Sequence, residues 1–361
     1  MKKSHVIEWD TKDFQQKVMD WYGKNARDLP WRMPRETKKA VKPNPYHVWL
    51  SEIMLQQTTV LAVKSYFEKF THLWPTLADL AHADEDAVMR EWAGLGYYAR
   101  ARNLIKCARE VFNHYDGAFP RTEKELLKLP GIGRYTAAAI LSIAFHQESV
   151  VVDGNIERIT SRLFMIEEPL PQSKKTIYQQ ASIIYDGIGC SASDMPQALM
   201  DIGATICTPK SPKCSLCPVC SYCQAFHFSE PEKYPHKASK LKKPSRVGEV
   251  YWIETENQQI VVEKRGGNRM LGNMAGLPGT NWDGYGQEKI PDLDWQRAGE
   301  ITHVFTHFSL KLTIMKGKIR SSMLILNKNQ YLVDINNLGD VGFPSLFRKV
   351  IHFVSTLKEV E

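Results

Sequence analysis

Apolar side chains recur at helical spacing through roughly the first 225 residues and at strand spacing in the last third of the chain. In the helical part, Asn44-Pro45 has the form of a helix start, with asparagine as the cap and proline at the first helical position. The following helix directs apolar side chains towards a core at Val48, Trp49, Ile53 and Leu55. It also places Glu52 and Gln56 one turn apart on one side.

Further helices follow in the same part of the chain. Residues 86–92 predict a helix that stops near Gly94. Thr122 and Glu125 have capping-box spacing for a helix that reaches Leu129. Residues 137–145 are almost wholly apolar, so we expect a buried helix there.

The composition changes after Cys223. Residues 226–246 are rich in lysine, serine and proline and show little apolar periodicity, which predicts a linker. Beyond them, strands are predicted at 249–254, at 260–264 and around Leu310, Leu312 and Ile314, followed by a helix at 344–357. We therefore expect a helical domain over residues 1–225, a linker over 226–246 and an α+β domain over 247–361.

Composition adds limits rather than a function. A chain of 361 residues is too long for one compact domain, and its 43% hydrophobic and 24% charged residues are ordinary for a globular protein. No apolar run approaches a membrane span, and the first residues do not resemble a signal peptide, so we expect a cytoplasmic protein without membrane contact. The net charge of +7 fits a polyanionic partner without requiring one.

The cysteines predict a metal centre. Five of the seven crowd between Cys207 and Cys223, which indicates a metal site in a reducing compartment rather than a disulfide framework. Four follow the spacing C-x6-C-x2-C-x5-C, namely Cys207, Cys214, Cys217 and Cys223. Four thiolates suit tetrahedral zinc as well as an iron–sulfur cluster, so the spacing alone leaves the metal open.

A glycine turn and two lysines elsewhere in the chain are candidates for binding phosphate. Gly131 and Gly133, in L-P-G-I-G at 129–133, predict a tight turn between two helices whose backbone N–H groups can bind a phosphate. Lys210 and Lys213 lie in the loop between the first two candidate ligands. For either lysine alone, a solvated surface charge is at least as common as a phosphate contact.

The order of these motifs resembles that of a known superfamily. L-P-G-I-G at 129–133, V-D-G-N at 152–155 and the cysteine set together resemble the helix–hairpin–helix DNA glycosylases. V-W-L-S-E-I-M-L-Q-Q-T at 48–58 is more closely similar to the MutY adenine glycosylases, which excise adenine mispaired with 8-oxoguanine. The resemblance implies a helix–hairpin–helix domain with one 4Fe-4S cluster on the four cysteines, in a monomer acting on double-stranded DNA with A:8-oxoguanine or A:G mispairs.

Two carboxylates carry the implied chemistry. Breaking an N-glycosidic bond requires protonation of the leaving base and stabilisation of a cationic sugar, which two carboxylates can divide. The resemblance implies that Glu52 protonates adenine and that Asp153 stabilises the sugar cation, supported by Asn155 and with Tyr135 as a helper. Both carboxylates lie beside apolar residues, where burial raises a carboxyl pKa. On spacing alone, Glu52 is more often a solvated helix residue.

Tyr135 distinguishes between members of the superfamily. Members that cut the strand carry a lysine there, which forms a Schiff base with the sugar, and a tyrosine cannot do so. We therefore expect a monofunctional glycosylase that leaves an abasic site. The alternatives are an endonuclease III-like enzyme acting on oxidised pyrimidines and a non-catalytic, cluster-bearing damage sensor.

Base recognition follows from the same resemblance, because adenine must leave the stack to be reached. The residues implied for the walls of the adenine pocket are Arg27, Trp31, Leu55 and Gln197. Those implied to wedge into the stack or touch the opposite base are Gln57, Thr58, Leu95 and Tyr97. For Trp31, Leu55 or Leu95 alone, core packing is the commoner role.

The last part of the chain resembles the Nudix-like C-terminal domain of the MutY family, through L-P-G at 277–279 and H-V-F-T-H at 303–307. The R-E-x-x-E-E core of the Nudix metal box is absent from 280–299, so we expect this domain to bind rather than hydrolyse. Phe305, Thr306 and His307 match a loop that senses 8-oxoguanine, with threonine in place of the usual serine. Two departures have no assigned role: a basic insertion at 34–42 and the lack of a tryptophan at 271–275.

Overall fold

The structure is a computed structural model that describes residues 8–33, 42–238, 243–267, 269–280, 282 and 292–358. The basic insertion predicted at 34–42 lies outside these residues except for Lys42. Contacts within the chain define two compact units. One contains the residues up to His82 together with 106–240, and the other contains 83–105 together with the residues from 241 onwards.

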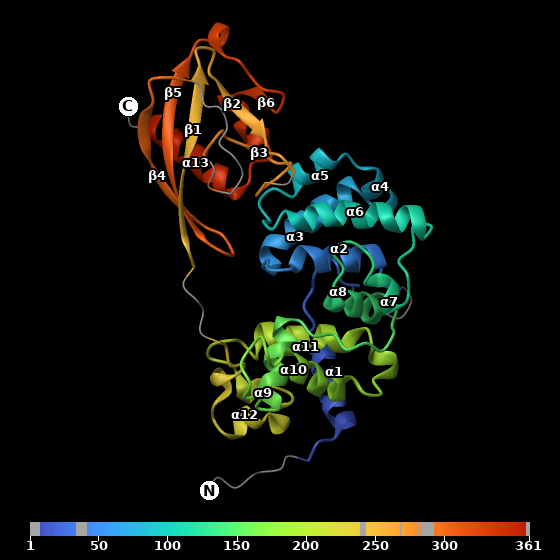
Figure 1. The fold of residues 1–361 in the computed structure, drawn as a ribbon. Coiled ribbons are helices and arrows are strands. Elements are labelled where there is room, and N and C mark those ends of the chain that lie inside the picture. Colours follow the sequence, from blue (N-terminus) through green and yellow to red (C-terminus); the bar gives the residue numbers. More distant parts are fainter. Residues whose placement is uncertain are drawn as a thin grey trace. The chain divides into compact units, whose positions relative to one another are not determined.

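The first unit is helical, as the apolar spacing predicted (Figure 1). Its α-helices are α1 (Thr11–Asn25), α2 (Pro45–Leu55), α3 (Val60–Leu73), α4 (Leu77–His82), α6 (Ala99–His114, shared with the second unit), α7 (Glu123–Leu126), α8 (Arg134–Ala139), α9 (Gly154–Leu163), α10 (Lys174–Tyr185), α11 (Asp194–Thr205) and α12 (Gln224–His227). Short 3₁₀ turns are η2 (Gly189–Ser191), η3 (Cys214–Leu216), η4 (Cys220–Tyr222) and η5 (Pro231–Lys233). No helix among the described residues has the length and apolarity to cross a membrane.

Helix α2 starts as predicted, because the Asn44 side chain accepts a hydrogen bond of 2.9 Å from the backbone N–H of Tyr46 and Pro45 occupies the first turn. The helix ends at Leu55 and is buried along most of its length. Gln57, two residues later, has a φ of 57° in the left-handed region, so the chain turns sharply there. Glu52 is thus held on a rigid, buried helix directly before a turn.

The predicted hairpin turn is present, although its first helix is shorter than expected. The Glu125 backbone N–H donates to the Thr122 hydroxyl at 3.3 Å, yet α7 ends at Leu126 instead of reaching Leu129. Pro130 disfavours helical torsions at the residue before it and provides no N–H, which explains the early end. Gly131 has a φ of 77°, and Gly133 caps α8. Both glycines are exposed, so their backbone is accessible.

The apolar segment at 137–145 is buried as predicted, but it is not one regular α-helix. After Ala139 the backbone widens into a π-helix, η1 (Ile140–Ala144), all of whose residues are buried. The Ser142 hydroxyl, which would otherwise be unsatisfied, donates to the carbonyl of Ala192 at 2.6 Å. Short π segments occur often at functional sites, and Ile143 of this one reaches the cavity described below.

The second unit contains a six-stranded mixed sheet, in agreement with the predicted α+β class (Figure 1). Its strands are β1 (Ser245–Thr255), β2 (Gln259–Lys264), β3 (Ala275–Gly276), β4 (Gln296–Val304), β5 (Ser309–Ile319) and β6 (Gln330–Asp334). The order is β3-β2-β1-β5-β4, with β6 also on β2, and β1 and β5 are parallel. Helices α5 (Glu85–Glu91) and α13 (Ser345–Lys358) confirm the predicted ones, and η6 (Ser321–Met323) and η7 (Ile335–Asp340) are short turns.

The stretch predicted as a linker, 226–246, contains regular structure in its described part. Helix α12 ends within it, turn η5 lies within it, and β1 already begins at Ser245. Ser245 pairs with Ser309 of β5, so the last residues of this stretch belong to the sheet. The core of the second unit lies between the sheet and α13, where Phe347 and Val350 pack with Trp252 and Leu312.

Candidate active site

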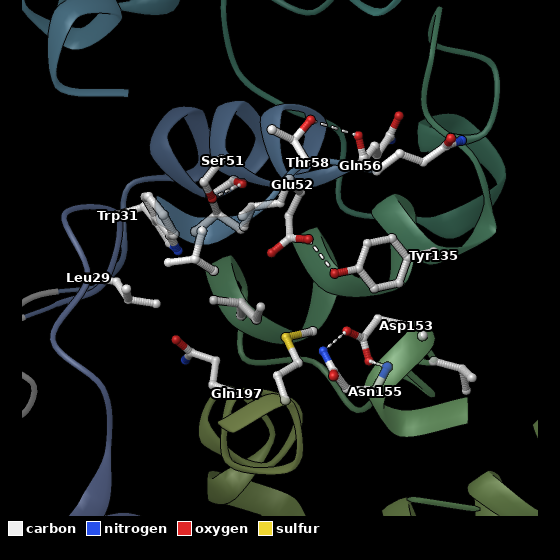
Figure 2. A pocket seen from close by; sticks show the side chains of 18 of the residues that line it. Leu29, Trp31, Ser51, Glu52, Gln56, Thr58, Tyr135, Asp153, Asn155 and Gln197 are labelled. Atoms are coloured by element: carbon white, nitrogen blue, oxygen red, sulfur yellow. Dashed lines mark hydrogen bonds between the residues drawn. The ribbon is translucent and has the colours of Figure 1, made fainter. Parts of the chain in front are cut away.

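A cavity of about 590 Å³ in the first unit brings together the residues predicted for catalysis and for the adenine pocket (Figure 2). The predicted catalytic and adenine-pocket residues all line it: Glu52, Tyr135, Asp153, Asn155, Arg27, Trp31, Leu55 and Gln197. Gln57 and Thr58, predicted to contact DNA, also lie on its wall. The sequence did not single out several further lining residues, including Ile143, Val152, Glu157, Lys174 and Met200.

Glu52 is a buried carboxyl group that points into this cavity, with only 5% of the residue exposed. Burial raises the pKa of Glu52 from its ordinary value of 4.5 to about 7, although a hydrogen bond from the Tyr135 hydroxyl to Oε2 opposes the rise. A carboxyl group with a pKa near neutrality can hold a proton and still release it. Glu52 therefore has the properties of a general acid.

Asp153 faces the same cavity from the N-terminus of α9, which it caps. Its Oδ1 accepts hydrogen bonds from the backbone N–H groups of Asn155 at 3.0 Å and Ile156 at 2.7 Å, and its Oδ2 accepts one from Asn155 Nδ2 at 2.8 Å. The pKa of Asp153 is raised overall, because burial outweighs the opposing effect of these hydrogen bonds. The helix N-terminus and three donors favour the anion, so Asp153 suits a charge-stabilising role better than Glu52 does.

Tyr135 lies beside both carboxylates, in the first turn of α8. Burial raises the pKa of its phenol well above the ordinary value, and the neighbouring Glu52 and Asp153 raise it further. The phenol is therefore a neutral hydrogen-bond donor at physiological pH. It orients the Glu52 carboxyl group and provides no amine that could attack a sugar.

Asn155 is held in turn by a residue that the sequence analysis missed. Its Oδ1 accepts a hydrogen bond of 3.0 Å from Arg158, whose guanidinium also donates to the carbonyl oxygens of Gly203 and Cys207, each at 2.7 Å. Gly203 of α11 packs directly against this asparagine, since a Cβ built on it would lie 2.5 Å from the Asn155 Cβ. Only glycine fits at 203 without displacing Asn155.

The contact between Gly203 and Asn155 predicts that one added methyl group at position 203 will slow base excision. Gly203→Ala should push Asn155 away from Asp153 and lower the rate of base excision about tenfold or more, because small misplacements of reacting groups are costly. Single-turnover excision kinetics would measure the loss. Gly23→Ala is the matched control, since Gly23 lies in α1 with no atom within 4 Å of the added Cβ and should retain full activity. An unchanged rate in Gly203→Ala would show that the packing can relax.

Arg27 and Arg32 form one side of the cavity around a carboxylate that the sequence analysis also missed. Asp201 of α11 is fully buried and accepts hydrogen bonds from Arg27 Nε at 2.6 Å, Arg32 Nη1 at 2.8 Å and Arg32 Nη2 at 2.9 Å. These bonds fix both arginine side chains. An aspartate within the apolar helix and four residues after Gln197 was the available signal, because i and i+4 share a helix face.

The other predicted DNA contacts lie outside this cavity. Leu95 is only 6% exposed, as a packing residue would be, whereas Tyr97 is 46% exposed. Arg100 donates to the carbonyls of Leu95 at 3.1 Å and Gly96 at 3.2 Å, so it holds this turn. Thr306 and His307 are exposed between β4 and β5, while Phe305 is partly buried. Lys210 and Lys213 are exposed, as expected for phosphate contacts.

The four candidate cysteine ligands are partly buried free thiols. Arg162 Nη1 donates to Cys207 Sγ at 3.2 Å, and the sulfur of Cys223 lies 3.6 Å from the Arg162 carbonyl oxygen. Burial raises the pKa of Cys217 and Cys223 to about 12, so a metal would have to displace their protons. The donor chemistry fits a thiolate-bound metal or cluster. Within the described residues, no group of three or more His, Cys, Asp or Glu side chains is arranged to hold a metal ion, and the ligand set stays a prediction.

Comparison with family models finds two domains in this chain, one in its helical part and one in its C-terminal part. Residues 50–184 match the HhH-GPD superfamily of base excision DNA repair proteins, and residues 249–353 match the NUDIX domain. The two matches confirm the predicted combination of a helix–hairpin–helix domain and a Nudix-like domain.

Individual relatives are more specific. The adenine DNA glycosylase of Buchnera aphidicola subsp. Acyrthosiphon pisum (strain APS) is 39% identical over 354 residues, which cover 94% of this chain and 96% of that enzyme. The adenine DNA glycosylase of Homo sapiens is 33% identical over 359 residues, covering 82% of this chain and 65% of the human enzyme. The structure of a thermostable thymine-DNA glycosylase is similar with a TM-score of 0.52 and 31% identity, over 60% of this chain and 97% of that one. The chain therefore belongs to the adenine DNA glycosylases, base-excision repair enzymes that hydrolyse N-glycosyl bonds.

Proposed function

We propose that this enzyme removes adenine paired with 8-oxoguanine or guanine in duplex DNA and leaves the strand uncut at an abasic site, acting as a monomer. One observation supports this above the others: Glu52, Tyr135 and Asp153 converge in a single cavity. Glu52 has a pKa near neutrality and accepts one hydrogen bond, which suits an acid, whereas Asp153 accepts three hydrogen bonds at a helix N-terminus, which suits an anion.

The chemistry requires that adenine leave the stack and enter the cavity. Arg27, Trp31, Leu55 and Gln197 would enclose the base. Glu52 then donates its proton to a ring nitrogen, and the electrons of the glycosidic bond move onto the base as it departs. The Asp153 carboxylate faces the positive charge that develops on the sugar, and water completes the hydrolysis by adding to the anomeric carbon and passing a proton to the ionised Glu52.

Contacts with the rest of the DNA involve separate surfaces. Gly131 and Gly133 would hold a backbone phosphate through exposed N–H groups, next to the N-terminus of α8. Gln57, Thr58, Leu95 and Tyr97 would act on the stack around the extruded adenine. In the second unit, the exposed hydroxyl of Thr306, with Phe305 and His307, would read 8-oxoguanine as a serine-containing loop does.

A 4Fe-4S cluster would be held by Cys207, Cys214, Cys217 and Cys223, which leaves Cys220 as a spare thiol in the same segment. When bound, such a cluster supplies four strong iron–thiolate bonds that fix the fold of the loop. Lys210 and Lys213 belong to this loop, so fixing it would hold two cations where they can contact phosphates.

The test is a duplex with one adenine opposite 8-oxoguanine, or opposite guanine, incubated with the protein and divided for alkali treatment. We expect cleavage of the adenine strand only after alkali, and faster reaction opposite 8-oxoguanine. Cleavage without alkali, trapped by borohydride, would identify a lyase, and its loss in Lys174→Gln would place the amine on the cavity wall. Action on oxidised pyrimidines alone would favour the endonuclease III-like alternative, and binding without cleavage a sensor.

A further inference from the structure

The turn between β4 and β5 carries the residues proposed to read 8-oxoguanine. A hydrogen bond and three aromatic rings support this turn where it leaves the sheet. The Phe305 N–H donates to the carbonyl of Phe308 at 2.8 Å, which closes the turn. The Phe305 ring stacks on Trp282 with 5.8 Å between centroids and lies 4.8 Å from the ring of Phe308. Trp282 and Phe308 are buried, whereas Thr306 and His307 are exposed at the tip. The orientation of the tip therefore depends on these three aromatic residues.

The segment that enters β1 runs beside the same turn. The Pro244 carbonyl accepts a hydrogen bond of 3.0 Å from the Ser309 N–H, directly after the turn. From the next residue onwards, β1 pairs in parallel with β5, beginning with Ser245 opposite Ser309 (Figure 1). The end of the stretch that looks like a linker in the sequence is thus fixed against the recognition turn.

Two cations of this segment contact the three aromatic residues that support the turn. The Arg246 guanidinium lies 4.2 Å from the centroid of the Phe308 ring, and its Nη1 donates to the Trp282 carbonyl at 3.2 Å. Lys243 Nζ donates to the Phe305 carbonyl at 2.8 Å. A planar guanidinium over an aromatic ring with a hydrogen bond at its edge is a geometry that lysine does not reproduce.

We infer that Arg246, assisted by Lys243, is a positioning residue that sets the lesion specificity of the enzyme by holding the 305–308 turn against Trp282. The inference rests on the proposed recognition of 8-oxoguanine by this turn. Neither cation has to touch the lesion: each fixes the backbone or ring from which Thr306 and His307 project. The entry to β1 is then part of the recognition apparatus and not only a connection.

A simple phosphate contact by Arg246 would behave differently. Phosphate contacts carry no information on the opposite base, so their loss weakens binding to all duplexes alike. Loss of positioning would act on the 8-oxoguanine duplex and leave the guanine duplex nearly unchanged. The ratio of kcat/KM for adenine opposite 8-oxoguanine to that opposite guanine separates the two cases.

The experiment uses the full-length chain with Arg246→Met, Arg246→Lys and Lys243→Met. Lys318→Met is the matched control, because Lys318 is an exposed cation at the far end of β5 from the turn. We expect the ratio to fall about three- to tenfold in Arg246→Met, clearly also in Arg246→Lys, less in Lys243→Met and not at all in the control. If Arg246→Met fails to fold, as thermal unfolding would show, the other two variants carry the test.

An unchanged ratio in the folded Arg246 variants would overturn the inference, as would full restoration by lysine, which keeps the charge but not the planar stacking. Equal losses on both duplexes would identify a phosphate contact instead. A wild-type enzyme with no preference for 8-oxoguanine over guanine would refute the proposed recognition itself, and the inference with it. The wild-type ratio therefore distinguishes the two failures.

Discussion

Glu52→Gln is expected to lower the single-turnover rate of adenine excision by about 10³-fold, because glutamine cannot supply the proton that the leaving base requires. The substitution keeps the size of the side chain, and its amide oxygen can still accept the Tyr135 hydroxyl. Binding of the mispair should therefore change little. Excision at more than about a tenth of the wild-type rate would show that Glu52 is not the acid.

The wild-type enzyme should also show the titration of this acid. With a pKa of about 7, Glu52 is protonated below neutrality and ionised above it, so excision should slow as pH rises through that value. Single-turnover rates between about pH 6 and 9 would show this limb, and Glu52→Gln should lack it. A flat wild-type profile would contradict the assignment.

The ionisation of Glu52 should also lower the stability of the folded chain. The folded chain binds the Glu52 proton more tightly than the unfolded chain, so stability should fall as pH rises from about 4.5 to about 7 and stay lowered above that. A rise of that size corresponds to about 3 kcal/mol. Glu52→Gln should therefore resist urea better than the wild type at about pH 8, with little gain at about pH 4. Lower stability of the variant at the higher pH would show that ionised Glu52 is not strained by burial.

Local sequence was sufficient where short-range physics positions a residue. Asn44 and Pro45 start α2, and Asp153 precedes a helix as its cap, so both carboxylates of the site lie on elements that their neighbours specify. The burial that raises the pKa of Glu52 was expected from the adjacent apolar residues. The family resemblance added the roles, which periodicity and spacing could not provide.

Long-range contacts explain what was missed. Asp201 is separated by 174 positions from Arg27 in the sequence. Its function as the common hydrogen-bond acceptor of Arg27 and Arg32 therefore appears only in three dimensions. Gly203 is required by its contact with Asn155, and no glycine pattern in the sequence indicates that. The composition of 226–246 indicated a linker, although Arg246 is held in a sheet by a strand that lies far along the chain. The composition of a segment reflects how polar it is, whereas its pairing in a sheet depends on a partner strand that is distant in the sequence.

Asp153→Asn is expected to reduce excision by about 10³-fold while leaving the fold intact, because the two functions of Asp153 are separable in this variant. Asparagine caps helices as well as aspartate does, and its Oδ1 can accept the same backbone N–H groups of Asn155 and Ile156. It lacks the negative charge opposite the developing sugar cation, and its amide nitrogen cannot accept the hydrogen bond that Oδ2 receives from Asn155 Nδ2. The loss should therefore fall on kcat with KM little changed, and thermal unfolding should be nearly that of the wild type.

Glu157→Gln provides the matched control for this result. Glu157 is a partly buried carboxylate one turn further along α9 that lines the same cavity, and burial raises its pKa as it does that of Asp153. It lacks the cap hydrogen bonds that aim Asp153, so we expect its removal to change excision by less than about threefold. Comparable losses in both variants would mean that the summed negative charge of the cavity stabilises the sugar cation. A loss confined to Asp153→Asn would show that stabilisation depends on one carboxylate held in place by a helix N-terminus and Asn155.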